Sequence, residues 1–403
     1  MRNELLDCKK DFPIFKNQDI TYLDTASTSQ KPQNVINAVT RFYQNYNANV
    51  HRGLYPWAEK ATSDYESSRN KIADYINAQN QELIFTKGTT ESINFISNSW
   101  GRANLTKKSN IVITEMEHHS NIVPWQILSQ RTGAELRYIP ISDTGELNLD
   151  NISKIIDENT KIVSVTHQSN VFGTINPIDY IISESHNKGA LVLIDAAQSI
   201  AHQEIDVKSI DCDFLVFSGH KILAPAGIGC LYVKENLLNQ LEPYQTGGQM
   251  ISQVNKNKST WNDIPFRFEA GTPNIEGVIG LGAAIDYLKE IDMINIKYHN
   301  QVIKKYCLDQ MRSIDNLKVY GHITNNAGPV ISFNVDGIHS YDVAQLLAQQ
   351  NIYIRSGHHC AQPIMRKLNI ESSNRASLYI YNDLKDIDNL INGIKKAVKM
   401  LVG

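Results

Sequence analysis

Six short apolar runs alternate with helical or loop stretches through the middle of the chain, and this order restricts the fold strongly. The runs cover residues 110–114, 135–140, 162–166, 190–194, 214–217 and 229–233. Runs of this length between helical patterns are typical of strands in a mostly parallel, helix-covered sheet. The sequence therefore predicts an α/β fold in which ligands meet the carboxyl ends of the strands.

Two of these runs end in polar residues that suit one cofactor. The run before Asp195 continues to Gln198, and the run before Ser218 continues to His220 and Lys221. A lysine at a buried strand end loses hydration, which lowers its pKa and makes it an amine nucleophile. A neighbouring aspartate keeps the pyridine nitrogen of pyridoxal phosphate (PLP) protonated. Either residue alone is more often structural, in a buried ion pair or on the surface, but the pair favours a PLP site.

Two further polar clusters follow strand-like runs. Thr89 and Thr90 follow residues 83–86 and precede an apolar helical pattern, so they suit a phosphate at a helix N-terminus, although such a turn is more often only a helix cap. His118 and His119 follow the run at 110–114. One imidazole there suits stacking on a pyridine ring. A metal pair and ordinary loop histidines are the alternatives, and adjacent positions disfavour shared metal ligation.

The chain has five cysteines without the paired spacings of zinc sites or disulfide frameworks, so we expect reduced thiols and no metal site. Cys360 differs from the others because residues 355–363 form a polar loop with Gly and Pro, where a thiol is exposed near cationic groups. The formal net charge of -3 gives no reason to expect nucleic acid or an anionic membrane as a partner. With no signal-peptide or membrane-spanning pattern, we expect a cytoplasmic protein.

The last third of the chain changes pattern. Helical spacing over residues 274–291 continues into a charged helix to about residue 311. Beyond it, a smaller α+β unit is expected from the segments at 317–320, 330–335, 341–350, 352–355, 376–381 and 384–401. The sequence therefore predicts two domains.

The ordered motifs of nearly the whole chain resemble the class V aminotransferase-like PLP enzymes, and within them the cysteine desulfurases of the sulfur-mobilisation (Suf) type. The matching segments are residues 22–24, 49–53, 117–119, 218–221, 268–273, 355–363 and 375–378. The resemblance implies the PLP-dependent transferase fold of type I, with a seven-stranded, mostly parallel sheet. It implies a large PLP-binding domain over residues 22–295 and a small domain from residues 1–21 and 296–403. It also implies a homodimer with sites at the interface.

The resemblance also implies a role for each matching residue. Lys221 resembles the lysine that forms the Schiff base with PLP, Asp195 the pyridinium partner, Gln198 the donor to the phenolate oxygen, and His118 the stacking histidine. The phosphate ligands correspond to Thr89, Thr90, Ser218 and His220, with Thr272 reaching the partner subunit's phosphate. Arg375 resembles the clamp on the substrate carboxylate, and Asn170, Arg355, His51 and Arg52 resemble the residues that help bind or admit the substrate.

The implied reaction converts L-cysteine to L-alanine and leaves the sulfur on Cys360 as a persulfide, which passes to an acceptor protein of the SufE or SufU type for iron-sulfur cluster assembly. Selenocysteine lyase or cysteine sulfinate desulfinase activity is an alternative, and a non-catalytic sulfur-carrier scaffold is a more distant one. Residues 54–57, 222–227 and 246–250 depart from the family pattern around the entrance of the site. These departures concern substrate preference and acceptor choice rather than the reaction class.

Overall fold

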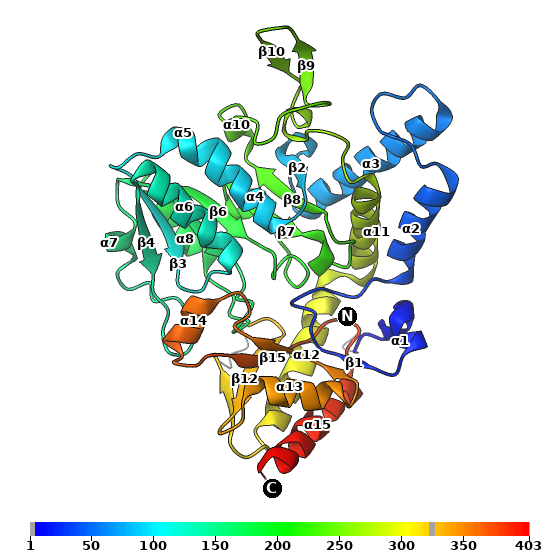
Figure 1. The fold of residues 1–403 in the computed structure, drawn as a ribbon, viewed down its shortest axis with the longest axis vertical. Helices are drawn as coiled ribbons and strands as arrows, with labels where there is room; N and C mark the ends of the chain where they lie inside the picture. The colour runs from blue at the N-terminus through cyan, green and yellow to red at the C-terminus, as the bar shows by residue number, and fades with distance from the viewer. Residues whose placement is uncertain (1–4, 322–326, 403) are drawn as a thin grey trace.

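The computed structural model describes residues 5–321 and 327–402, and the elements and contacts below belong to this part of the chain. Its largest sheet has seven strands in the order β2-β8-β7-β6-β5-β3-β4 (Figure 1). They are β2 (Leu83–Thr86), β3 (Asn110–Thr114), β4 (Glu135–Ile139), β5 (Thr160–Thr166), β6 (Leu191–Asp195), β7 (Phe214–Ser218) and β8 (Gly229–Val233). β8 runs antiparallel to both of its neighbours, β2 and β7, and the other pairs of neighbouring strands are parallel. The predicted mostly parallel sheet is confirmed.

Both faces of this sheet are buried, because alternate residues of each strand pack into two separate apolar clusters. Val192 and Ile194 of β6 join one cluster, whereas Leu193 joins the other. The first face packs against α2 (Gln33–Asn45), α3 (Pro56–Tyr75), α8 (Ile178–His186) and α11 (Ile275–Ile291). The second packs against α4 (Thr89–Ile96), α6 (Val123–Thr132) and α10 (Glu235–Leu238).

A second, antiparallel sheet has the order β11-β12-β15-β14 and lies below the first in Figure 1. Its strands are β11 (Leu317–Tyr320), β12 (Val330–Val335), β15 (Ser373–Ser377) and β14 (Arg355–Gly357). It shares an apolar cluster with α12 (Met293–Met311), α13 (Ser340–Ala348) and α15 (Leu384–Val402). The early strand β1 (Thr21–Tyr22) pairs with β13 (Ile352–Tyr353), so the N-terminal segment returns to this part of the molecule. The shorter helices are α1 (Pro13–Asn17), α5 (Arg102–Asn104), α7 (Ile152–Ile155), α9 (Val207–Ile210) and α14 (Gln362–Lys367).

The structure defines two of the expected segments more exactly. The helical stretch expected over residues 274–311 is confirmed, and it divides into α11 and α12 because Asp292 has a positive φ of 74° and its side chain caps α12 by accepting the N–H of Ile294. The segment expected at 376–381 as part of the α+β unit contains only the last two residues of a strand, β15 (Ser373–Ser377). Residues 378–381 are buried, but the N–H of Tyr379 donates to the Asn382 side chain in a turn, so burial and not strand pairing accounts for their apolar character.

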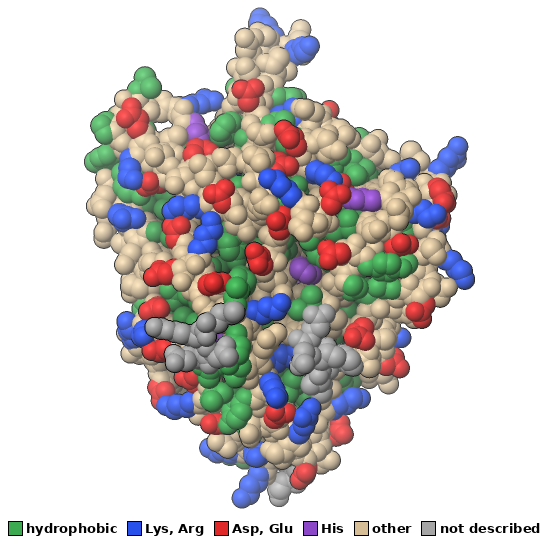
Figure 2. All heavy atoms as spheres, turned by 180° about the vertical axis from the view of Figure 1, so that it is seen from behind, with side chains coloured by type: hydrophobic (Ala, Val, Ile, Leu, Met, Phe, Trp, Pro, Cys, Tyr) green, Lys and Arg blue, Asp and Glu red, His purple; other side chains and the backbone are tan. Residues whose placement is uncertain are grey.

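A hairpin of β9 (Ile251–Val254) and β10 (Ser259–Trp261) projects from the top of the molecule in Figure 1. Its Val254 side chain is 65% exposed and Trp261 is 41% exposed. On the face seen in Figure 2, Lys and Arg side chains are interspersed with Asp and Glu. Among the described helices, none is both apolar enough and long enough to cross a bilayer.

Candidate active site

The carboxyl ends of β5, β6 and β7 meet at one cavity of about 220 Å³. Its wall contains most of the predicted site residues, namely Thr89, Thr90, His118, Asn170, Asp195, Gln198, Ser218, His220, Lys221, Arg355, Cys360 and Arg375. The main-chain positions of Arg355, Cys360 and Arg375 come from the second sheet and its loops. The cavity therefore lies between the two sheets.

Lys221 and Asp195 provide opposite charges at adjacent strand ends. Lys221 ends the short turn that follows β7, and burial lowers the pKa of its amine from 10.5 to about 8, although Asp195 acts in the opposite direction. Asp195 is the last residue of β6, and its Oδ1 accepts the N–H of Ala197 at 2.9 Å. Burial raises the pKa of Asp195, while the Ala197 N–H and Lys221 oppose that rise. The amine thus loses its proton near pH 8, in mildly basic solution, rather than at the pH of an ordinary lysine.

A cluster of hydroxyl and N–H groups lies where β7 meets the N-terminus of α4. The Ser218 Oγ accepts the N–H of Thr89 at 2.9 Å and lies 2.9 Å from Thr89 Oγ1. Gly88 precedes the helix with φ of 147°, and a Cβ at that position would lie 3.0 Å from Ser218 Oγ. His220 is next to this cluster, and burial together with Lys221 and Lys31 lowers its pKa to about 4. A helix N-terminus with these donors suits an anionic ligand.

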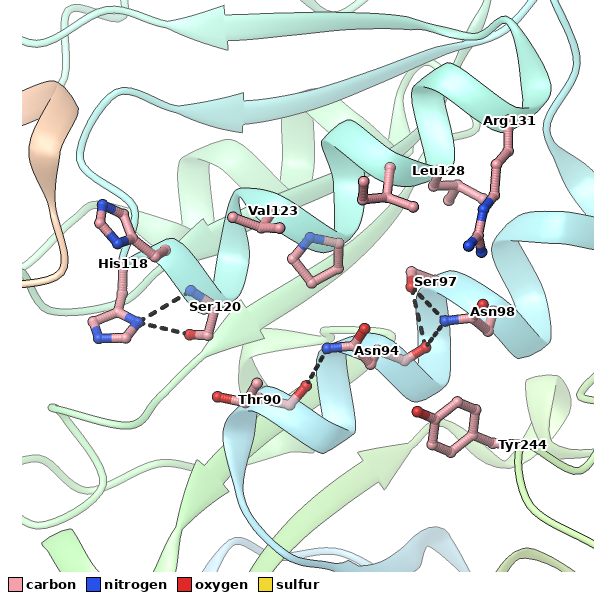
Figure 3. Close-up of a pocket in the computed structure, with 13 residues that line it drawn as sticks. Thr90, Asn94, Ser97, Asn98, His118, Ser120, Val123, Leu128, Arg131 and Tyr244 are labelled. Atoms are coloured by element: carbon pink, nitrogen blue, oxygen red, sulfur yellow. Dashed lines mark hydrogen bonds between the residues drawn. The ribbon is translucent and has the colours of Figure 1, made fainter.

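His118 lies across the cavity with a defined ring orientation. Its Nδ1 accepts the N–H of Ser120 at 3.1 Å and lies 2.9 Å from Ser120 Oγ (Figure 3). Burial and the charge of Lys221 lower its pKa to about 3, so the ring is neutral at pH 7 with its proton on Nε2. Thr90, His118 and Ser120 also line a second cavity of about 490 Å³ that extends between α4 and α6 toward Arg131 (Figure 3).

Arg375 is a buried cation with an unused donor. Its side chain is 3% exposed, its Nη2 donates to Asp24 Oδ1 at 3.0 Å, and its Nη1 donates to the Asn170 carbonyl oxygen at 3.1 Å. Among the described residues, no acceptor lies within hydrogen-bonding distance of Nε. Burial lowers the pKa of the guanidinium, and Asp24 opposes that effect. A buried donor without a partner indicates a place for an anionic group.

Cys360 lies in a strained loop beside this arginine. His359 and Cys360 have positive φ values of 53° and 55°. The loop is held because the Cys360 carbonyl accepts the N–H of His119 at 2.7 Å and the His359 carbonyl accepts Asn170 Nδ2 at 2.7 Å. Cys360 is half-buried, whereas Cys8, Cys212, Cys230 and Cys307 are buried, and all five are free thiols. Of the five, Cys360 is thus the thiol with access to the cavity.

His119, His358 and Cys360 place possible metal-ligand atoms within 4.8 Å of one another. Each of the two imidazoles already accepts a backbone N–H: His358 Nδ1 from Cys360 and His119 Nε2 from Gln362, both at 3.1 Å. The opposite nitrogen of each neutral ring therefore carries a proton and not a free lone pair. These hydrogen bonds order the loop, and a metal ion would have to displace them.

Three predicted residues lie away from the cavity. Both ring nitrogens of His51 form hydrogen bonds elsewhere. Its Nε2 lies 2.8 Å from Glu66 Oε1, and its Nδ1 lies 3.0 Å from Gln249 Nε2. Arg52 and Thr272 are exposed, and Thr272 lines a separate cavity of about 470 Å³. The single chain does not bring these residues to Lys221.

The cavity also contains residues that sequence reasoning did not assign to it, notably Ser27, Ala26 and Thr166. Asp24 supports the site through Arg375, and Gln198 Nε2 donates to the Ala26 carbonyl at 2.9 Å. Like the runs that become β6 and β7, the segment around Leu23 changes from apolar to polar, at Asp24. The strand before it has only two residues, so this change is a weak sequence signal for a site residue.

Comparison with known proteins places the chain in one family. The family model for class V aminotransferases matches residues 21–390. A probable cysteine desulfurase of Halalkalibacterium halodurans is 46% identical over 97% of both chains, and a cysteine desulfurase of Shigella sonnei is 44% identical over 98% of both. Among solved structures, the apo cysteine desulfurase of Thermococcus onnurineus NA1 has a TM-score of 0.95, 37% identity and full coverage of both chains. The Escherichia coli cysteine desulfurase CsdA has a TM-score of 0.92, 34% identity and 98% coverage of both chains. The chain belongs to the class V aminotransferase family.

Proposed function

We propose that this protein is a PLP-dependent cysteine desulfurase, which converts L-cysteine to L-alanine and passes the sulfur from Cys360 to an acceptor protein for iron-sulfur cluster assembly. The observation that carries the proposal is the convergence of Lys221, Asp195, Arg375 and Cys360 on one cavity. The cysteine desulfurase names of relatives at 44–46% identity support the same activity. An aminotransferase would have no use for a thiol at position 360.

The donor set fits PLP. Thr89, Thr90, Ser218 and His220 would hold the phosphate, because they surround a helix N-terminus and carry no negative charge. Asp195 would hold the pyridine nitrogen, and the neutral His118 ring would stack on the pyridine. When bound, PLP supplies an electron sink for charge that develops at the substrate α-carbon.

Lys221 acts as the base in this proposal. Its amine has a pKa of about 8, so a substantial fraction is neutral in mildly basic solution and Nζ can accept the α-proton of the substrate. Arg375 and Arg355 both lie near this amine, and Asp24 offsets the positive charge of Arg375 through a hydrogen bond. The substrate carboxylate pairs with Arg375, whose Nε has no acceptor among the described residues.

Cys360 takes the sulfur. An S–S bond forms between Cys360 Sγ and the substrate sulfur as the substrate C–S bond breaks, and the bonding pair of the C–S bond stays with the carbon framework. Protonation of that carbon releases L-alanine. The net change is L-cysteine plus the Cys360 thiol giving L-alanine plus a Cys360 persulfide, with no external oxidant or reductant.

The test follows the sulfur atom. Brief incubation with L-cysteine should add one sulfur to the Cys360 peptide, detected by mass spectrometry, and Cys360→Ser should still change its visible spectrum with L-cysteine but release little alanine. Cys307→Ser is the matched control, because that thiol is fully buried, and it should keep alanine release and persulfide at Cys360. Sulfur on another cysteine, or alanine release by Cys360→Ser at the original rate, contradicts the proposal. Selenide or sulfite release in preference to sulfur transfer would identify one of the related lyase activities instead.

We also propose a cytoplasmic homodimer. In it, His51, Arg52 and Thr272 would complete the partner's site, and an acceptor of the SufE or SufU type would receive the persulfide. Large apolar side chains just before α3 and in its first turn support an interface there, since Leu54 is 94% exposed and Trp57 is 59% exposed. Sedimentation analysis should find a dimer, and Leu54→Asp with Trp57→Asp should weaken it. A monomeric parent protein with full activity would contradict this arrangement.

A further inference from the structure

The hydroxyl of Ser27 joins three charged side chains at the edge of the cavity. Ser27 Oγ donates to Asp24 Oδ1 at 2.7 Å. The same oxygen accepts Arg375 Nη2 at 2.8 Å and Arg355 Nη1 at 2.8 Å. A serine hydroxyl has one proton to donate and two lone pairs to accept with, so all of its hydrogen-bonding capacity is used here.

Each arginine depends on this hydroxyl in a different way. Arg375 also has Asp24 and the Asn170 carbonyl as acceptors, so Ser27 restricts the rotation of a guanidinium that is already held. Arg355 has, within residues 5–321 and 327–402, no side-chain hydrogen bond other than the one to Ser27. Loss of the hydroxyl would therefore leave Arg355 free to turn away and would loosen Arg375.

The orientation matters because Asp24 and Ser27 use both N–H groups of Arg375 Nη2, which leaves the buried Nε–H and the second N–H of Nη1 for an anion. Nε–H can give a carboxylate one charge-assisted hydrogen bond, and Arg355, of which Ser27 uses one N–H group, can supply others, so the clamp requires both guanidinium planes in fixed orientations. Two guanidiniums that share one oxygen also hold their positive charges close together. That arrangement attracts an anion to the same point of the cavity.

We propose that Ser27 is a positioning residue that orients Arg375 and Arg355 toward the α-carboxylate of the substrate. The inference rests on the proposed function, in which Arg375 binds that carboxylate. It adds that selection for an amino acid over a simple amine depends on a hydroxyl 348 residues away from Arg375 in the chain.

The backbone of this segment is anchored without the Ser27 hydroxyl. The Ala26 N–H donates to Ser377 Oγ at 2.9 Å, and the Ser27 N–H donates to the Asp24 carbonyl at 3.0 Å. The Ser29 N–H donates to the His220 carbonyl at 2.9 Å. Removing only Oγ should therefore leave the segment in place.

The experiment compares L-cysteine with cysteamine, which has the same amine and thiol but no carboxylate. Both are titrated into PLP-loaded protein that carries Cys360→Ser, so that no sulfur leaves, and the visible spectrum gives each dissociation constant. Ser27→Ala should raise the constant for L-cysteine about tenfold, the size expected for lost hydrogen bonds to charged groups. The constant for cysteamine should stay within about twofold, and Ser27→Thr should restore L-cysteine binding because it keeps the hydroxyl.

Thr28→Ala is the matched control, since it removes a neighbouring hydroxyl that donates to the His220 carbonyl and contacts neither arginine. It should leave the ratio of the two constants unchanged. In protein with Cys360 intact, Ser27→Ala should raise KM for L-cysteine and leave kcat within about twofold. Circular dichroism and the melting temperature of each variant report folding separately.

Arg375→Lys separates this inference from the proposed function. If Arg375→Lys weakens L-cysteine selectively and Ser27→Ala does not, the role of Ser27 is overturned and the carboxylate clamp stands. If Arg375→Lys weakens neither ligand, the clamp itself is wrong and the inference falls with it. Equal weakening of both ligands by Ser27→Ala also overturns the inference, because a positioning role toward the carboxylate cannot affect cysteamine.

Discussion

Burial sets the chemistry of the individual residues around Lys221. The charged amine loses hydration inside the cavity, and its pKa falls to about 8, while the imidazole of His118 is held neutral for the same reason. Asp195 opposes the change at Lys221, and Arg375 adds to it. Burial and neighbouring charges therefore set the protonation states of Lys221 and His118, and these states can be measured.

The uptake of PLP by the apoprotein should depend on the Lys221 amine. Only the neutral amine is nucleophilic, so the rate at which visible absorbance develops should rise with pH through a midpoint near 8. N-acetyl-lysine methylamide in the same buffers is the control, and its rate should keep rising toward the ordinary lysine pKa of about 10.4. A midpoint for the protein close to that of the model amine would show that Lys221 is hydrated.

Asp195→Asn should keep the fold and lose activity. A neutral amide cannot hold a pyridine nitrogen in its protonated form, and the loss in kcat should be about a hundredfold or more, as for other single electrostatic stabilisers. Asp213→Asn is a buried control outside the cavity, where the carboxylate bonds to His186 and the Val192 N–H, and it should affect stability more than kcat. Alanine release and circular dichroism decide between the two effects. Unchanged turnover in Asp195→Asn would leave the aspartate with a structural role only.

At the scale of elements, β7, β8 and α4 approach so closely that one position admits no side chain. A Cβ at Gly229 would lie 2.4 Å from Gly88 Cα and 2.6 Å from the Phe217 carbonyl oxygen, both of which are backbone atoms. Gly88 begins the turn that brings Thr89 to Ser218. The position of β8 and the proposed phosphate site thus both depend on the close approach of Gly229 to Gly88.

Gly229→Ala should therefore lower the free energy of unfolding by about 1–3 kcal/mol, because the added methyl forces the backbone apart. It should also weaken PLP binding, since the N-terminus of α4 must move. Urea denaturation and PLP titration measure the two effects. Gly248→Ala is the control, because a Cβ there has no atom within 4 Å, and it should change neither quantity by a comparable amount. Normal PLP affinity in a destabilised Gly229→Ala protein would separate the strand contact from the site.

At the scale of the whole molecule, a buried ion pair joins α3, β2 and the segment before α11. Arg69 contacts Glu269 through two hydrogen bonds of 2.8 Å, and their side chains are 1% and 3% exposed. Burial acts to lower the pKa of Arg69, but Glu269 outweighs it and holds the pKa above its ordinary value. Glu269 also accepts the N–H of Phe85, which fixes the segment leading to Thr272.

Glu269→Gln should destabilise the protein by about 3–5 kcal/mol, because it removes the buried counterion of Arg69 and leaves only the partly exposed Glu66 carboxylate, 3.0 Å from Nε, as an ion-pair partner. The double variant Arg69→Met with Glu269→Gln should recover part of that loss, since no buried charge remains. Guanidinium chloride denaturation gives both values. Lys71→Met with Asp286→Asn is the comparison on the surface, where an exposed pair contributes about 1 kcal/mol or less. If Glu269→Gln lowers the free energy of unfolding no more than the surface double variant does, water must reach Arg69.

Local sequence determined the elements and the chemistry that directly follows them. The apolar runs before Asp195 and Ser218 are typical of strands that are buried on both faces of a sheet. Because neighbouring parallel strands end at the same edge, the polar residues that follow them lie close together there. The roles of Lys221 in cofactor binding and of Cys360 in sulfur transfer stay predictions, which rest on residue type and on the family resemblance. The domain boundary at residue 295 and the roles of His51, Arg52 and Thr272 also stay predictions.

Tertiary structure alone decided how distant groups meet. Ser27 and Arg375 are 348 residues apart, and no periodicity in either segment records that one hydroxyl holds two guanidiniums. The break at Asp292 and the end of β15 at Ser377 likewise depend on a side-chain cap and a turn, which apolar spacing does not report. Strand and helix patterns follow from neighbouring residues in the chain. The hydrogen bonds of Ser27 to both arginines instead form only when the two sheets and the N-terminal segment pack together.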